Sequence, residues 1–118
     1  MLRVYEYAKC STCRKALKFL EKKGVRYQRV SMVEHPPTPG ELEEMLRVIG
    51  DIKRLFNTSG ELYREMKLSE KLPRMSEPEA LDLLSRHWKL VKRPFALGAA
   101  VALLGFDEAE WKKTFSTK

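Results

Sequence analysis

Cys10 and Cys13 are the two cysteines of this 118-residue chain, and two residues separate them. A Cys-x-x-Cys pair can alternate between two thiols and one disulfide, which suits redox chemistry. The thiolate is the reacting form of a cysteine, and nearby positive charge stabilises it. Lys9, Arg14 and Lys15 flank the pair. We therefore expect Cys10 to be a nucleophile with a pKa below its ordinary value of about 8.5.

The two cysteines lie where an expected strand gives way to an expected helix. Residues 1–7 are rich in aromatic and aliphatic side chains, whereas apolar residues recur at helical spacing within 14–23. Cys10 then lies in the turn, and Ser11 or Thr12 is the expected N-cap. The unpaired amides and the dipole at a helix start also favour a thiolate.

Two other uses of the pair are weighed against redox chemistry. Zinc would need two ligands besides the cysteines, and the chain offers His35 and His87 without the paired spacing of a zinc module. A structural disulfide is expected in secreted chains, and the sequence shows no secretory leader. We therefore expect no metal and a cytoplasmic protein in which both thiols are kept reduced.

Length and charge limit the class of protein. A chain of 118 residues predicts a single domain spanning 1–118. No apolar run reaches the length of a membrane span, so no membrane association is expected. The formal net charge is +7, but the basic residues are scattered and no nucleic-acid-binding motif accompanies them. Direct binding to nucleic acid is therefore not expected, and the charge favours anionic substrates.

Three later segments are expected to be strands, and they are 25–33, 95–97 and 101–104. The first follows the helix at 14–23, which predicts a parallel βαβ unit with a right-handed crossover. The other two are separated by Gly98-Ala99-Ala100, a sequence suited to an antiparallel hairpin. Asp107 is the expected N-cap of a last helix that buries Trp111.

The region between the strands reads as helical. Thr38 is the expected cap of its first helix, and Ser76 with Glu79 forms an expected capping box for a later helix that extends to Trp88. The element order is thus β-α-β, a helical stretch, and β-β-α. This order predicts an α/β, thioredoxin-like mixed sheet carrying an inserted helical subdomain. The sheet core would comprise about 1–35 and 88–118, and the helical insertion about 38–87.

Arg93 and Pro94 form a second chemical landmark just before the expected strand at 95–97. A proline at such a place can adopt the cis form. In thioredoxin-like proteins a cis-proline loop faces the redox cysteine, so Arg93 would lie beside Cys10. A guanidinium there would stabilise the thiolate and bind an anion. The alternative is an ordinary surface arginine in a loop.

These residues resemble the arsenate reductase / Spx family, which includes ArsC-like and YffB-like proteins. The matching segments are Tyr5 with Cys10-Ser11-Thr12-Cys13-Arg14-Lys15-Ala16, Leu90-Val91-Lys92-Arg93-Pro94, and Gly105-Phe106 with Trp111. The resemblance implies a thioredoxin-like fold with an inserted helical subdomain, a redox thiol at Cys10 and an anion-binding role for Arg93. The expected catalytic residues are Cys10 and Cys13, and the expected substrate-binding residues are Arg93, Thr12, Arg14 and Pro94.

The chain departs from this family at two arginine positions. Glutathione-dependent arsenate reductases use further arginines in the central helical region and after the hairpin. Here Ser59 stands at the first place, and residues 98–105 contain no basic residue. Each missing charge-assisted hydrogen bond would remove about 1.5–3 kcal/mol of oxyanion binding. The sequence thus argues against efficient arsenate reduction unless Arg54 or Arg64 compensates.

Two functions follow from the resemblance. The leading hypothesis is a thiol-dependent reductase in which Cys10 attacks the substrate and Cys13 or glutathione resolves the adduct; glutathione would be a co-substrate, with no bound cofactor. The alternative is an Spx-like regulator that senses oxidation through a Cys10–Cys13 disulfide and binds the alpha subunit of RNA polymerase. A family member that binds glutathione weakly and has lost both roles is a third possibility.

Overall fold

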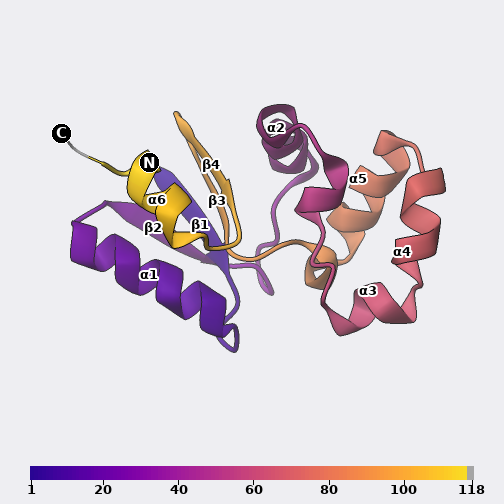
Figure 1. The fold of residues 1–118 in the computed structure, drawn as a ribbon, viewed down its shortest axis with the longest axis horizontal. Coiled ribbons are helices and arrows are strands. Elements are labelled where there is room, and N and C mark those ends of the chain that lie inside the picture. The colour runs from indigo at the N-terminus through magenta and orange to yellow at the C-terminus, as the bar shows by residue number, and fades with distance from the viewer. Residues whose placement is uncertain (117–118) are drawn as a thin grey trace. The chain divides into compact units, whose positions relative to one another are not determined.

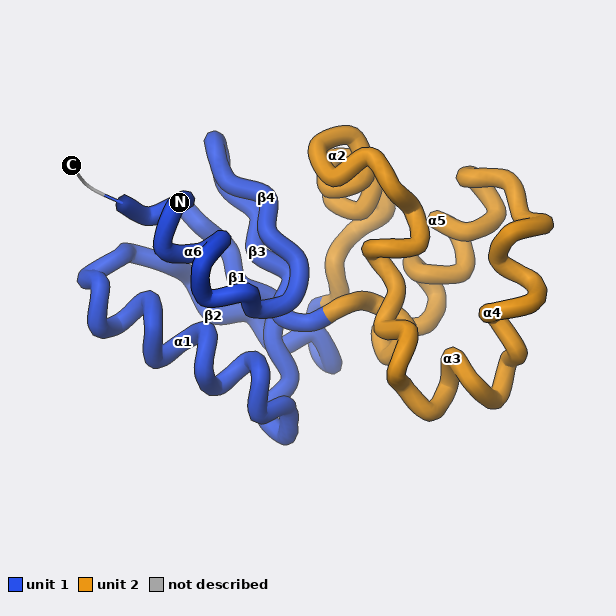
Figure 2. Tube along the Cα trace, viewed as in Figure 1, with its two compact units in different colours: residues 1–35, 93–118 blue, residues 36–92 orange. Residues whose placement is uncertain are grey.

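The computed structural model describes residues 1–116 and divides the chain into two compact units, which Figures 1 and 2 show. One unit holds residues 1–35 and the chain from Arg93 onward, and the other holds 36–92. None of the helices in the described part of the chain is long and apolar enough to cross a membrane.

The first unit is a mixed four-stranded sheet with two helices. Its elements are β1 (Leu2–Glu6), α1 (Ser11–Lys23), β2 (Tyr27–Ser31), β3 (Phe95–Gly98), β4 (Val101–Leu104) and α6 (Glu108–Thr114). The strand order is β2-β1-β3-β4. Strand β1 is parallel to β2 and antiparallel to β3, and β3 is antiparallel to β4. The predicted thioredoxin-like α/β layout is therefore confirmed.

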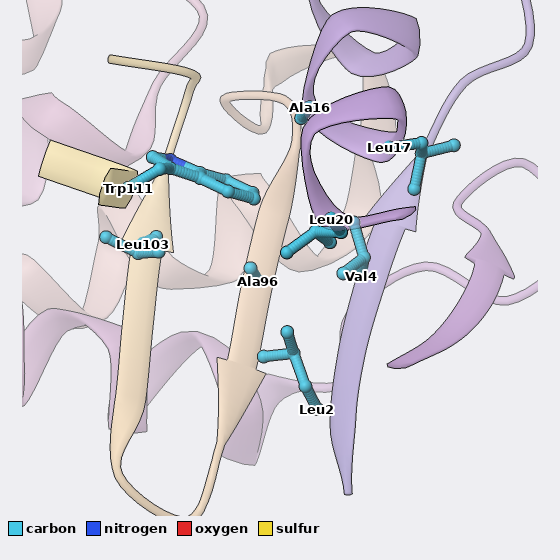
Figure 3. Packing of buried hydrophobic residues seen from close by; sticks show 8 residues of the cluster. All are labelled: Leu2, Val4, Ala16, Leu17, Leu20, Ala96, Leu103 and Trp111. Atoms are coloured by element: carbon cyan, nitrogen blue, oxygen red, sulfur yellow. The ribbon is translucent and has the colours of Figure 1, made fainter. Parts of the chain in front are cut away.

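One face of this sheet carries the core of the unit, and Figure 3 shows its packing. The cluster contains eight buried residues from β1, α1, β3, β4 and α6, namely Leu2, Val4, Ala16, Leu17, Leu20, Ala96, Leu103 and Trp111. Both Leu20 and Trp111 are 0% exposed. The indole Nε1 of Trp111 donates to the Gly105 carbonyl at 3.1 Å, so its polar atom is satisfied inside the core. Helices α1 and α6 are thus held on the same face of the sheet.

Local sequence explains the boundaries of α1. Its apolar residues recur three and four positions apart, so they form the stripe that packs on the sheet. Gly24 ends the helix with φ 72°, a left-handed conformation that glycine adopts without a steric penalty. The helix start is described with the candidate site, because Cys10 forms part of it.

The second unit is helical. It contains α2 (Pro39–Ile49), α3 (Glu61–Glu65), α4 (Leu68–Lys71) and α5 (Glu77–Arg86), with short 3₁₀ turns at Ile52–Leu55, Leu72–Arg74 and Trp88–Leu90. Capping boxes at Thr38 and Ser76 start α2 and α5 as predicted. The prediction that α5 reaches Trp88 is wrong. The helix ends at Arg86, and Trp88 is only partly buried in the 3₁₀ turn that follows.

Residues 88–92 are paired with the helical unit. The Asn57 N–H donates to the Leu90 carbonyl at 2.7 Å, and the Lys92 N–H donates to the Leu55 carbonyl at 2.8 Å. The return to the sheet unit therefore comes at Arg93, five residues after the expected boundary near 88.

Candidate active site

Cys10 is the N-cap of helix α1. Its backbone is extended, with φ −95° and ψ 113°, and its Sγ accepts a hydrogen bond from the Cys13 N–H at 3.2 Å. A cap side chain commonly accepts from the third residue of the helix, which is the spacing of Cys-x-x-Cys. The prediction of Ser11 or Thr12 as N-cap is therefore wrong, since both lie within the exposed first turn. The sulfur itself lies at the positive end of a 13-residue helix.

Cys13 lies directly behind Cys10 and is 0% exposed. Both cysteines are free thiols in this structure. Burial raises the pKa of Cys13 to about 12, and its hydrogen bond to the sulfur of Cys10 acts in the same direction. Cys13 is thus protonated at neutral pH, and its thiol donates to Cys10.

The pKa of Cys10 is lowered by the groups that contact its sulfur. Partial burial alone would raise it, but hydrogen bonds from the Cys13 thiol, the Cys13 N–H and the Arg93 side chain outweigh that effect. The positive charge of Arg93 acts in the same direction. The thiolate of Cys10 is therefore more stable than that of an ordinary cysteine, and its sulfur is only half-buried and within reach of a substrate.

The sheet register explains how Arg93 reaches the site. Tyr5 of β1 pairs with Phe95 of β3 in an antiparallel register. Continuing that register by two residues beyond Tyr5 sets Tyr7 opposite Arg93. The structure agrees, because the guanidinium carbon of Arg93 lies over the Tyr7 ring, 5.4 Å from its centroid.

Pro94 follows Arg93, and the peptide bond between them is cis. Pro94 is buried, and its carbonyl accepts a hydrogen bond from the Gly105 N–H at 2.9 Å. This bond ties the Arg93–Pro94 loop to the end of β4. The segment that carries the guanidinium is therefore fixed to the sheet on both sides.

The other two predicted substrate-binding residues are placed differently. Thr12 lies in the exposed first turn of α1, between the two cysteines in the chain. The Arg14 guanidinium donates to the Ala8 carbonyl at 2.9 Å, so Arg14 ties down the loop that carries Cys10. The Cys10 N–H donates to the Tyr7 carbonyl at 2.9 Å at the other end of this loop.

Tyr7 is the residue of this site that the sequence analysis did not identify. Its signal is the register of β1 and β3, which the sequence alone does not fix. Within the described residues 1–116, no group of three or more His, Cys, Asp or Glu side chains is placed to hold a metal ion.

A thiol of lowered pKa at a helix start, a protonated thiol that donates to it and a guanidinium beside it form a site for thiol chemistry. Comparison with known proteins agrees with this reading of the fold. The model of the ArsC family matches residues 5–114. The chain belongs to the ArsC family.

Several relatives of this ArsC family member cover nearly its whole length. The uncharacterized protein YusI of Bacillus subtilis is 41% identical over 116 residues, which is 98% of either chain. A crystal structure of an ArsC family related protein from Bacteroides fragilis superposes with a TM-score of 0.90 at 42% identity, covering 95% of both chains.

Two more distant relatives carry functional names. The global transcriptional regulator Spx 2 of Oceanobacillus iheyensis is 26% identical, covering 94% of this chain and 82% of its own. The arsenate reductase of Neisseria meningitidis serogroup A is 26% identical, covering 88% of this chain and 89% of its own. Relatives of this chain thus include both an enzyme and a regulator.

Proposed function

We propose that this ArsC family member is a thiol-dependent reductase that uses Cys10 as its nucleophile and glutathione as its electron donor. The observation that carries the proposal is the half-buried sulfur of Cys10, which accepts hydrogen bonds from Cys13 and Arg93 at the start of α1. Such a sulfur ionises more readily than an ordinary thiol and is accessible, and both properties favour thiol–disulfide exchange.

The substrate of this reaction is a disulfide, such as a glutathionylated thiol. The Cys10 thiolate attacks one substrate sulfur, the substrate S–S bond breaks, and the leaving thiolate takes a proton from water. Cys13 then loses its proton and attacks the sulfur of Cys10. This step releases the second substrate thiol and leaves a Cys10–Cys13 disulfide. Two molecules of glutathione reduce that disulfide and form glutathione disulfide, which balances the electrons.

The structure offers a reason for Cys13 to react only after Cys10. Burial raises the pKa of Cys13 most, but the hydrogen bond to the Cys10 sulfur and the Cys10 charge raise it further. A mixed disulfide at Cys10 removes both of these contributions. The pKa of Cys13 therefore falls at the stage of the reaction at which its thiolate is needed.

Glutathione fits the charge of the site. The Arg93 guanidinium can form paired hydrogen bonds with a carboxylate, and glutathione has two carboxylates. Arsenate fits less well, since Ser59 and the 98–105 segment lack the arginines expected for a bound oxyanion. The proposal is therefore disulfide reduction, and a cytoplasmic location with a reducing thiol pool would supply the donor.

The test is a turnover assay with a glutathionylated peptide, glutathione and a coupled reductase for glutathione disulfide. We expect turnover by the wild type and none by Cys10→Ser, which retains an oxygen acceptor at the N-cap and so retains the helix start. Cys13→Ser should accumulate a mixed disulfide at Cys10 that mass spectrometry detects. Ser11→Ala, a change in the exposed first turn, is the matched control and should retain turnover. Equal rates for the wild type and Cys10→Ser would refute the proposal.

A redox-sensing regulator is the second candidate, and the specific observation in its favour is the relationship to Spx 2 over 94% of this chain. In this case the Cys10–Cys13 disulfide would change the binding of RNA polymerase through its alpha subunit. Purified alpha subunit should then bind one redox state of the wild type more tightly, and Cys13→Ser should abolish that difference. Redox-dependent binding without peptide turnover would favour the regulator over the enzyme.

A further inference from the structure

Tyr7 contacts all three groups of the thiol site. Its carbonyl accepts the Cys10 N–H at 2.9 Å, its backbone N–H donates to the sulfur of Cys13, and its ring lies under the guanidinium of Arg93 at 5.4 Å. One residue between a strand and a loop thus contacts the proposed nucleophile, the proposed resolving thiol and the arginine beside them.

We propose that Tyr7 is the positioning residue of this site: its ring holds the Arg93 guanidinium at Cys10 Sγ, while its backbone fixes the two sulfurs. The proposal rests on the proposed role of Cys10 as nucleophile, and it adds that Tyr7 acts through Arg93. Tyr7 itself does not touch the reacting atoms of a substrate.

The geometry explains why a ring is suited to this task. An arginine that lies over an aromatic face uses its π surface for that contact, so the N–H groups at its edge stay available as donors. Those edge donors serve the sulfur of Cys10 in the resting site. The same edge can serve a carboxylate of glutathione once a mixed disulfide has formed. An aliphatic residue at position 7 would leave the long arginine side chain free to sample other rotamers.

The backbone of Tyr7 also contacts both cysteines. The carbonyl of this residue accepts the Cys10 N–H and its N–H donates to Cys13, so the ring and the two sulfurs are tied to the same backbone segment. The antiparallel pairing of β1 with β3 places Arg93 opposite Tyr7. The position of Arg93 relative to the two sulfurs therefore depends on Tyr7 and on the pairing of these strands.

The experiment measures the pKa of Cys10 from the pH dependence of its alkylation by iodoacetamide, read by mass spectrometry, with a phosphine reductant present. We expect Tyr7→Leu to raise this pKa by about half a unit, equivalent to about a threefold loss of thiolate at a pH below the pKa. Tyr7→Phe retains an aromatic face and should retain the low pKa. Tyr27→Leu, which removes a tyrosine of β2 that bonds Glu21, is the matched control and should change nothing.

A double substitution separates positioning from a general structural role. If Tyr7 acts through Arg93, Tyr7→Leu combined with Arg93→Ala should give the same pKa as Arg93→Ala alone. Additive shifts would overturn the proposal, as would an unchanged pKa in Tyr7→Leu or an equal rise in Tyr7→Phe. The pKa measurement needs no substrate, so it tests the role of Tyr7 even if the protein does not turn over the peptide. A failure of peptide turnover bears only on the proposed function.

Discussion

Replacing Arg93 by alanine is the perturbation that tests the electrostatics of the site most directly. The substitution removes a hydrogen bond and a positive charge from the sulfur of Cys10, and both lower its pKa in the wild type. A hydrogen bond to a charged group contributes about 1.5–3 kcal/mol. The sulfur is only half-buried, so solvent screens part of this and the lower end of the range applies. At about 1.4 kcal/mol per unit, the pKa of Cys10 should rise by about one unit.

The assay is the rate of iodoacetamide alkylation of Cys10 from about pH 5 to 10, followed by mass spectrometry so that Cys13 is scored separately. Arg93→Lys keeps the charge but loses the planar fork and the flat guanidinium face over Tyr7, so the pKa of Cys10 should lie between those in the wild type and in the alanine variant. Lys112→Ala removes one charge from α6, where Lys112 pairs with Glu108 at 3.7 Å, and should leave the pKa unchanged. Equal pKa shifts in Lys112→Ala and Arg93→Ala would show that the net charge of the protein, and not the position of Arg93, sets the pKa of Cys10. An unchanged pKa in Arg93→Ala would refute the contact between Arg93 and the Cys10 sulfur.

Three further predictions concern stability, each measured by urea unfolding under reducing conditions. The pKa of Cys13 is raised to about 12 in the folded protein, so the stability that this thiol contributes is complete below its ordinary pKa and is lost as the pH rises towards 12. Between about pH 9 and 10.5 the free energy of unfolding of the wild type should therefore fall relative to that of Cys13→Ala, by up to about 1.4 kcal/mol per pH unit. Parallel curves for the two proteins would contradict this prediction. Cys10→Ala loses the N-cap acceptor of α1 and should be about 1 kcal/mol less stable than Cys10→Ser, whereas equal stability would show that the cap is not needed. Leu20→Ala removes a fully buried side chain from the core below α1 and should cost about 2–5 kcal/mol, and a loss well below 1 kcal/mol would refute the packing in Figure 3.

The sequence predicts the elements around Cys10 well, because their signals are local. Helical spacing defines α1, Gly24 marks its end, and Asp107 caps α6 as expected. The sequence-based prediction of the helix start is wrong, because neighbouring residues compete for the N-cap position. Ser11 and Thr12 are better cap residues than cysteine by propensity, yet the cap is Cys10, one residue before Ser11, and its sulfur accepts the amide three residues on.

Long-range contacts were the harder part to predict. Nothing in the local pattern connects Tyr7 with a residue that follows the whole helical unit, and only the register of β1 against β3 brings Arg93 to it. Arg14 differs, because it lies beside the cysteines in the sequence and needs no long-range pairing to be near them. Its guanidinium donates to the carbonyl of Ala8, and its role in substrate binding stays a prediction.

The pKa of Cys10 has a local contribution and a long-range contribution. The helix start and the Cys-x-x-Cys spacing are local, so they lower the pKa of Cys10 partly without help from the rest of the fold. Arg93 adds the remaining stabilisation of the thiolate and does so only when β1 and β3 are paired in register. Separation of these strands should therefore raise the pKa of Cys10, because Arg93 would no longer lie at its sulfur. A thiol of this kind is most reactive in the native sheet.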